Sequence, residues 1–145
     1  MSAAPSFAFV EDVTSDVSFV AWGDSLEALF AAAANALLAA TLAEPATVEA
    51  RVEQEISLCE PDLELLLLRF LNELVFQRDA RDLLLRVASL RIDADGEARL
   101  EGTLAGERVD RARHALVGDV KAATAHGLRV GPEGHRFEAR VTLDV

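Results

Sequence analysis

Five polar residues are best suited to chemistry, namely Asp16, Lys121, Thr124, His126 and Asp144. Lys121 is the single lysine of the chain, since all the other basic side chains except histidine are arginines. A lysine ammonium is a compact charge whose pKa shifts readily on burial, whereas a guanidinium stays charged and favours planar, forked partners. Small side chains surround Lys121, so a ligand or partner has room to approach it. An ordinary solvated surface lysine is the alternative interpretation, because most lysines are exposed.

The carboxylates near the end of the sequence suit a hard cation. Asp144 falls on the polar face of an alternating final segment, and the α-carboxylate of Val145 adds a second oxygen group beside it. Clustered carboxylate oxygens bind Mg²⁺, Mn²⁺ or Ca²⁺. The alternative is that Asp144 is simply an exposed terminal residue.

Other common catalytic and metal motifs are missing from the sequence. The three histidines have no zinc spacing, no glycine-rich phosphate loop is present, and no serine lies in a nucleophile elbow. Cys59 ends an apolar segment, so we expect it to be a small core residue rather than a nucleophile.

Composition limits the possible classes of function. The length of 145 residues suits a single domain spanning 1–145, and a hydrophobic fraction of 51% is enough for a core. The net charge of −11 argues against autonomous nucleic-acid binding, which needs a basic surface. The lone cysteine and the lack of a recognisable signal peptide or membrane span favour a cytoplasmic protein.

The first half of the chain predicts strands and two helices. Short strands are expected over 7–10 and 17–22, and the phrase Asp24-Ser25-Leu26-Glu27 predicts a helix start. Clean alternation over 47–58 predicts a half-buried strand with Val48, Ala50, Val52, Ile56 and Leu58 on one face. A second helix, with Pro61 at its first position, is apolar around most of its circumference, so we expect neighbours on more than one side.

The second half predicts strands. Segments 83–92 and 98–104 flank a hairpin turn at 93–96, and a further turn is expected at 131–134 before the last strand, 136–145. If 120–130 is extended, Asp119 and Lys121 share one face, and Thr124 and His126 share the other. The segment 108–118 has no clear pattern. Two main helices among mostly antiparallel strands predict an α+β fold, a compact layered sandwich.

Four phrases in order carry a resemblance to a known family. They are Val13-Thr14-Ser15-Asp16 with the following strand and Gly23, the segment 62–76, the segment Asp119 to His126, and the terminal 137–145 ending in Leu-Asp-Val. With these phrases the chain resembles archease, the small protein that assists RtcB-type RNA ligases in tRNA splicing and RNA repair.

The resemblance implies a function and a site. Asp16 and Asp144 match the family's metal-binding aspartates, and Lys121 matches its functionally important lysine. Family members are not usually described as catalysts. They promote guanylylation of the ligase's active-site histidine and its repeated turnover, while the ligase uses GTP and Mn²⁺. Two departures stand out, because the family's histidine is Val13 here and the aromatic residue before the late histidine is Ala125.

Several interpretations remain open at this stage. Lys121 could contact a nucleotide phosphate or neutralise the carboxylate pair. A small metal-binding module, a metal-free chaperone-like module, or an enzyme using Lys121 and His126 are the competing functions.

Overall fold

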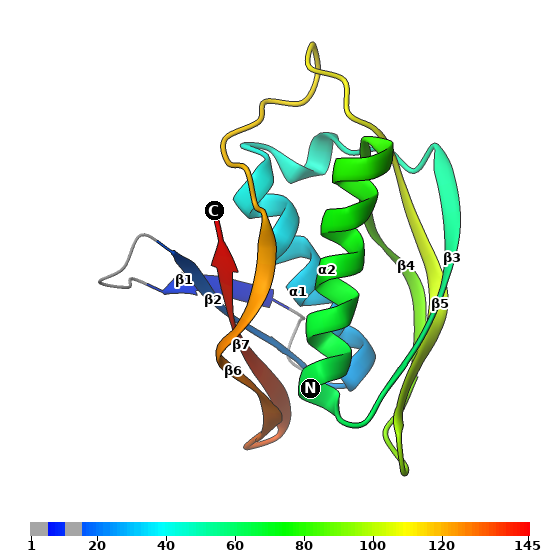
Figure 1. Ribbon diagram of the computed structural model, residues 1–145, viewed down its shortest axis with the longest axis vertical. Coiled ribbons are helices and arrows are strands. Elements are labelled where there is room, and N and C mark those ends of the chain that lie inside the picture. The colour runs from blue at the N-terminus through cyan, green and yellow to red at the C-terminus, as the bar shows by residue number, and fades with distance from the viewer. Residues whose placement is uncertain (1–5, 11–15) are drawn as a thin grey trace.

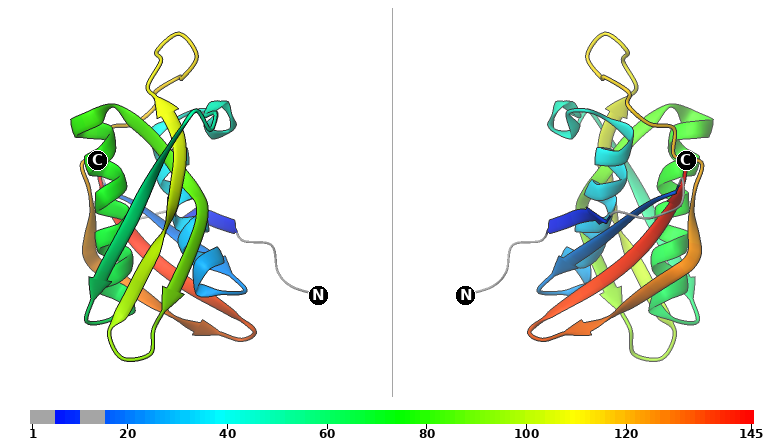
Figure 2. Two further views of the ribbon diagram at one scale, coloured as in Figure 1. Left: turned by 90° about the vertical axis from the view of Figure 1, so that its right-hand side faces the viewer. Right: turned by 90° about the vertical axis from the view of Figure 1, so that its left-hand side faces the viewer.

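Two helices lie between two antiparallel β-sheets in the computed structural model, which describes residues 6–10 and 16–145 (Figures 1 and 2). The helices are α1 (Leu26–Thr41) and α2 (Leu63–Arg81), with a short 3₁₀ turn, η1, at Pro45–Thr47. The described strands are β1 (Ser6–Val10), β2 (Val17–Gly23), β3 (Val52–Glu60), β4 (Leu83–Asp93), β5 (Ala98–Arg108), β6 (Ala122–Glu133) and β7 (Arg136–Asp144). The expected α+β sandwich is confirmed.

The first sheet has the strand order β1-β2-β7-β6, so the last strand of the chain lies between β2 and β6. As the alternation predicts, Ala139, Val141 and Leu143 of β7 face the helices and are buried. The same inner face of β2 contributes Phe19 and Ala21, both fully buried. This sheet carries the candidate site.

The second sheet has the order β3-β5-β4 and covers the other side of the helices (Figure 2). Its inner face contributes Ile56 and Leu58 from β3 and Leu100 and Leu104 from β5. The hairpin between β4 and β5 turns at Gly96, whose φ of 81° lies in the left-handed region that glycine tolerates. The hairpin predicted from the sequence is therefore confirmed, with longer strands.

Helix α1 begins as its sequence predicts. The Ser25 hydroxyl caps it by accepting a hydrogen bond from the backbone N–H of Ala28 at 3.0 Å. Glu27 does not complete a capping box, because its carboxylate accepts from the backbone N–H of Ile92 at 2.9 Å and ties the helix to β4. Phe30 of α1 meets Phe70 of α2 with ring centroids 5.6 Å apart, in the middle of the core.

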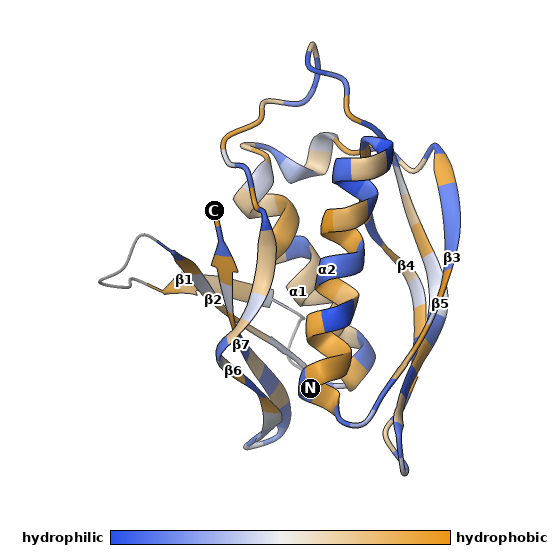
Figure 3. Cartoon of the chain, viewed as in Figure 1, coloured by the Kyte–Doolittle hydropathy of each residue, from blue (hydrophilic) through white to orange (hydrophobic). Residues whose placement is uncertain are grey.

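Helix α2 packs against both sheets and α1, as its apolar circumference predicts. Hydrophobic residues dominate its first half, and hydrophilic residues its last turn (Figure 3). The expectation that Pro61 occupies the first helical position is wrong. Asp62 is the N-cap, accepting from the backbone N–H of Leu65 at 2.9 Å, so Pro61 lies before the helix.

The predicted strand over 47–58 is correct only in its second part. Pro45 begins a 3₁₀ turn, and β3 starts at Val52. The backbone N–H of Glu49 donates to the Glu107 side chain at 2.6 Å instead of to a neighbouring strand. Ala50 and Val52 are exposed, whereas Val48, Ile56 and Leu58 are buried as expected.

Two further expectations are corrected. Cys59 is exposed rather than in the core, because odd-numbered residues of β3 point away from the helices. Its Sγ lies 3.3 Å from a Glu97 carboxylate oxygen, and this neighbour raises the pKa of the thiol. The last hairpin turns two residues later than predicted. β6 continues to Glu133, which pairs with Arg136, and Gly134 has a φ of 63°.

Candidate functional site

The start of β6 and the end of β7 meet at one end of the first sheet (Figure 1). The backbone N–H of Lys121 donates to the backbone carbonyl of Asp144 at 2.7 Å. The structure therefore brings together two of the residues predicted from the sequence. The side chains of both are exposed. Within the described residues, the Lys121 ammonium forms no ion pair with a carboxylate.

The register between β2 and β7 places Asp16 at the same end. Val17 pairs with Leu143. Asp16 immediately precedes Val17, and Asp144 immediately follows Leu143. Directly opposite residues of antiparallel strands have Cα atoms about 4.5–5.5 Å apart. Asp16 and Lys121 thus come immediately before the two strands that flank β7, and Asp144 is the last residue of β7. Val145 follows Asp144 and is 41% exposed.

A layer of hydroxyl groups lies just behind this end, on the outer face of the sheet. Ser18 Oγ and Thr142 Oγ1 are 2.9 Å apart, and both residues are buried. The Thr124 hydroxyl donates to the backbone carbonyl of Thr142 at 3.1 Å. Side chains alternate along a strand, so Thr142 and Asp144 share this face.

This donor set is of the kind that a hard divalent cation takes. Mg²⁺, Mn²⁺ and Ca²⁺ bind carboxylate, hydroxyl and carbonyl oxygens, and Asp16 and Asp144 supply two carboxylates on adjacent strands. Residues 6–10 and 16–145 contain no group of three acidic, histidine or cysteine side chains arranged for a metal. Two carboxylates are too few ligands for a closed structural centre, and the metal-binding role of Asp16 and Asp144 stays a prediction. The role of Val145 stays a prediction.

Helix α2 holds β6 by side-chain bonds to its backbone. Among the described strands β6 lies at the edge of its sheet, so one side of its backbone has no strand partner there. The Asn72 amide donates to the carbonyl of Ala123 at 3.0 Å and accepts from the same residue's N–H at 2.8 Å. At the other end of β6, Glu64 accepts from the N–H of Val130 at 3.1 Å. Sequence reasoning missed these roles, although Asn72 interrupts an otherwise apolar helix.

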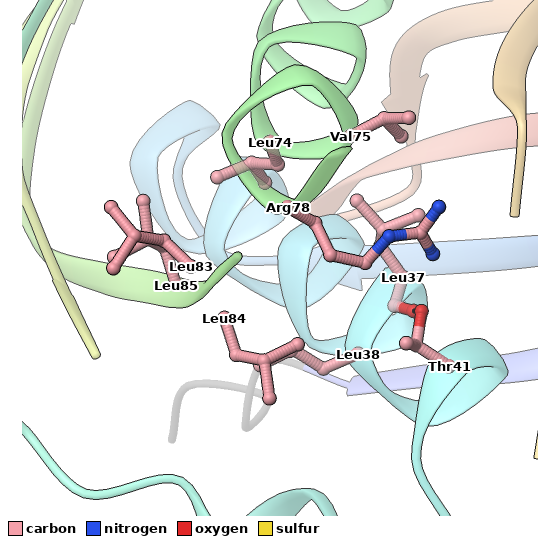
Figure 4. A pocket seen from close by; sticks show the side chains of 9 residues that line it. All are labelled: Leu37, Leu38, Thr41, Leu74, Val75, Arg78, Leu83, Leu84 and Leu85. Carbon is pink, nitrogen blue, oxygen red and sulfur yellow. The ribbon is translucent and has the colours of Figure 1, made fainter. Parts of the chain in front are cut away.

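Arg78 makes a third connection from the same helix. Its guanidinium donates to the carbonyl of Val120 at 2.6 Å and to Asp119 Oδ1 at 3.2 Å. The stem of Arg78 runs along a small pocket between α1, α2 and β4, whose apolar lining includes Leu37, Leu74 and Leu84 (Figure 4). Long basic side chains commonly pack their methylene groups against apolar surface in this way.

Thr124 and His126 do not share the extended face that the sequence predicts. β6 pairs with β7 from Ala122 to Thr124 and again from Arg129 to Glu133, and the register shifts between these two parts. Gly127, with a φ of 67°, lies inside this bulge, and His126 is exposed on it. A bulge re-aims side chains, so strand parity does not relate His126 to Lys121. Val13, the position of the missing family histidine, lies outside the described residues.

The connection before Lys121 is anchored by a buried carboxylate. Glu107 is 4% exposed and accepts from the N–H of Glu49, from the Arg113 guanidinium and from His114 Nε2, the last at 3.3 Å. The bond from Glu49 and the charge-assisted bond from Arg113 lower the pKa of Glu107 against the opposing effect of burial. His114 Nδ1 accepts from the N–H of Asp110 at 2.8 Å, so Nε2 is the ring nitrogen that faces Glu107 as a donor.

This anchor gives a structure to the segment 108–118 that the sequence left without a pattern. The backbone N–H of Val117 donates to the carbonyl of Thr41 at 2.9 Å, which joins the connection to the end of α1. Leu116 forms an isolated β-bridge with Leu42. The segment that precedes Lys121 is thus hydrogen-bonded to the end of α1.

Comparison with known proteins gives one family for nearly the whole chain. Residues 7–145 match the model of the Archease protein family (MTH1598/TM1083). The chain is similar to the protein archease of Methanothermobacter thermautotrophicus, with 34% identity over 92% of this chain and 95% of the relative. Its similarity to the protein archease of Pyrococcus furiosus is 33% identity over 91% and 94% of the two chains.

Solved structures show the same fold. The solution structure of Methanobacterium thermoautotrophicum protein 1598 has a TM-score of 0.81 and 33% identity, covering 96% of this chain and 98% of that one. The crystal structure of an archease and possible chaperone from Thermotoga maritima has a TM-score of 0.62 and 19% identity, over 94% and 95%. In the described part of the chain, neither helix combines the length and the apolar character needed to cross a membrane.

Proposed function

We propose that this chain, which belongs to the archease family, activates an RtcB-type RNA ligase in tRNA splicing or RNA repair. In this role it promotes guanylylation of the ligase and repeated turnover, and it does not itself join RNA. The ligase's chemistry takes place on the partner, and this chain contributes a site at the end of its first sheet.

The observation that carries the proposal is the convergence of Asp16, Lys121 and Asp144 at that end. The three residues match three separate family phrases, and they lie on three adjacent strands or at their ends. Spacing in the sequence does not require them to meet. Their meeting supports a shared role rather than three unrelated surface residues.

Lys121 is proposed to contact a phosphate of the ligase's nucleotide or RNA. Its side chain is exposed and forms no ion pair with Asp144 or any other described carboxylate. A lysine that balanced the carboxylate pair would be expected within ion-pair distance of one of them. A compact, mobile ammonium suits a phosphate that approaches from a partner.

Asp16 and Asp144 would hold the divalent ion, which supplies positive charge against phosphate or ligase carboxylate oxygens. Asp144 is exposed at the end of β7, where a partner can reach its carboxylate. The net charge of −11 is consistent with docking on a ligase whose RNA-binding surface is basic.

A ligation assay with the cognate ligase, GTP and Mn²⁺ tests the proposal. Added chain should raise the number of turnovers, while the chain alone should join no RNA. Asp144→Ala and Lys121→Ala should each remove the stimulation without unfolding the protein, because both side chains are exposed. Equal turnover with and without the chain, together with no detectable complex, would refute the role.

The competing functions give different results in the same set of experiments. A metal-free chaperone-like module would bind its partner with unchanged affinity in EDTA and in the Asp144→Ala variant. An enzyme using Lys121 would convert a substrate without the ligase. Covalent catalysis would also leave Lys121 labelled after borohydride trapping with a carbonyl substrate.

A further inference from the structure

We propose that Asn72 and Arg78 of α2 are positioning residues that hold the Lys121 segment in register beside Asp144. This inference rests on the proposed function of Lys121. It assigns a role to two helix residues that, within the described part of the chain, form no hydrogen bond or ion pair with the Asp144 carboxylate or the Lys121 ammonium.

Asn72 binds the chain on the C-terminal side of Lys121. Its side-chain amide pairs with both backbone groups of Ala123, at 3.0 Å and 2.8 Å, in the manner of a neighbouring strand. Asn72 is partly buried, and its partner Ala123 is buried. Such a two-point contact fixes rotation as well as distance, so Ala123 can neither slide along β7 nor turn over.

Arg78 binds the chain on the N-terminal side of Lys121. Its guanidinium donates to the carbonyl of Val120 at 2.6 Å, and its side chain is only 15% exposed. Packing against the apolar pocket limits the rotamers of the stem (Figure 4). Val120 itself is fully buried. Lys121 thus lies between two residues that are both bound to α2.

The pairing of β6 with β7 is too short to fix this segment unaided. Regular pairs run only from Ala122 to Thr124 before the bulge, and Lys121 adds one bond to Asp144. A short edge segment with small side chains is prone to slip in register. A slip of one residue would turn the Lys121 side chain to the opposite face of the sheet. The bonds to Asn72 and Arg78 oppose that slip.

Glu64 provides a matched control in the same molecule. It also lies on α2 and also accepts from a backbone N–H of β6, but its partner is Val130, beyond the bulge. If α2 merely stabilised the strand, loss of the Glu64 bond and loss of the Asn72 bonds would have similar consequences. A positioning role predicts that only Asn72 and Arg78 affect Lys121.

The experiment compares Asn72→Ala, Arg78→Met and Glu64→Ala in the full-length chain. Backbone amide exchange, followed by NMR, is measured at Lys121 and Val130, and ligase turnover is measured in parallel. Asn72→Ala and Arg78→Met should speed exchange at Lys121 by about tenfold and lower the stimulation by about tenfold, from the loss of one or two hydrogen bonds near the site. Glu64→Ala should speed exchange at Val130 and leave the stimulation unchanged.

Two results would overturn the inference. One is full stimulation by folded Asn72→Ala and Arg78→Met. The other is an equal effect of all three variants on Lys121 exchange and on turnover, which would show general stabilisation only. Failure of the parent chain to stimulate the ligase would instead refute the proposed function. In that case the exchange rates alone decide whether α2 fixes the Lys121 segment.

Discussion

The Asp144→Asn substitution should change stability in opposite directions with and without a divalent metal. Asp16 and Asp144 flank the paired residues Val17 and Leu143. If the same register continues by one residue, their Cα atoms lie about 5 Å apart. Two unit charges at about 5 Å in a near-aqueous environment repel by roughly 1 kcal/mol. Without metal, replacing one carboxylate by the isosteric amide should therefore stabilise the fold by up to about 1 kcal/mol.

Bound metal should make the parent more stable than Asp144→Asn. A ligand that binds only the folded state adds about 2.7 kcal/mol at a hundred times its dissociation constant. For a chain of this size, about 1 kcal/mol corresponds to roughly 3 °C in melting temperature, so the parent should melt about 8 °C higher with saturating Mn²⁺ or Ca²⁺. Asp144→Asn should show almost none of this rise, and the two melting curves should exchange order between EDTA and metal.

Scanning calorimetry in EDTA and in millimolar metal measures both halves of the prediction. Asp95→Asn is the control, since it makes the same charge change in the exposed turn between β4 and β5. It should keep the full metal-dependent rise. A parent melting temperature that does not respond to metal, or an Asp144→Asn variant that keeps the rise, would refute the assignment of this pair as a metal site.

Three further predictions concern other parts of the molecule. Lys121→Arg should restore little of the stimulation lost in Lys121→Ala, because the planar guanidinium does not reproduce a point charge, and turnover counts measure this. The fold lowers the pKa of Glu107, so the carboxylate stabilises the fold above its ordinary pKa and loses this effect as the pH falls through the lower folded value. In chemical denaturation between about pH 7 and pH 3, the free energy of unfolding of Glu107→Gln should therefore fall less steeply with decreasing pH than that of the parent. Gly106→Ala should destabilise by more than about 2 kcal/mol in chemical denaturation, because a Cβ there would lie 1.8 Å from the Leu84 carbonyl oxygen, whereas Gly131→Ala meets open space and should be nearly neutral.

Local sequence patterns predicted much of the fold, because the spacing of apolar residues within an element shows which of its faces is buried. The alternation of Phe137, Ala139, Val141 and Leu143 identifies the inner face of β7 without any knowledge of its partners. The same reasoning failed at residues 47–51, where alternating apolar residues imitate a strand. There the N–H of Glu49 is bound by the Glu107 side chain, a contact between segments far apart in the sequence.

The site was predictable in its members but not in its arrangement. Residue types and family phrases pointed to Asp16, Lys121 and Asp144. No local sequence pattern, however, predicts that β7 lies between β2 and β6. The supporting residues were harder still. Asn72 and Glu64 are visible as polar positions on α2, but which backbone they bind depends on the edge that the helix covers.

The central position of β7 has a consequence for how this site responds to change. Asp144 belongs to the strand that pairs on one side with β2 and on the other with β6. A shift of β7 would therefore move Asp144 relative to both Asp16 and Lys121, since β7 pairs with the two strands that follow these residues. β6, by contrast, is an edge strand with a bulge and can move without disturbing the carboxylate pair. The bonds from α2 are placed on β6, where strand pairing is weakest, and this is the arrangement expected if the position of Lys121 relative to a rigid carboxylate pair matters for function.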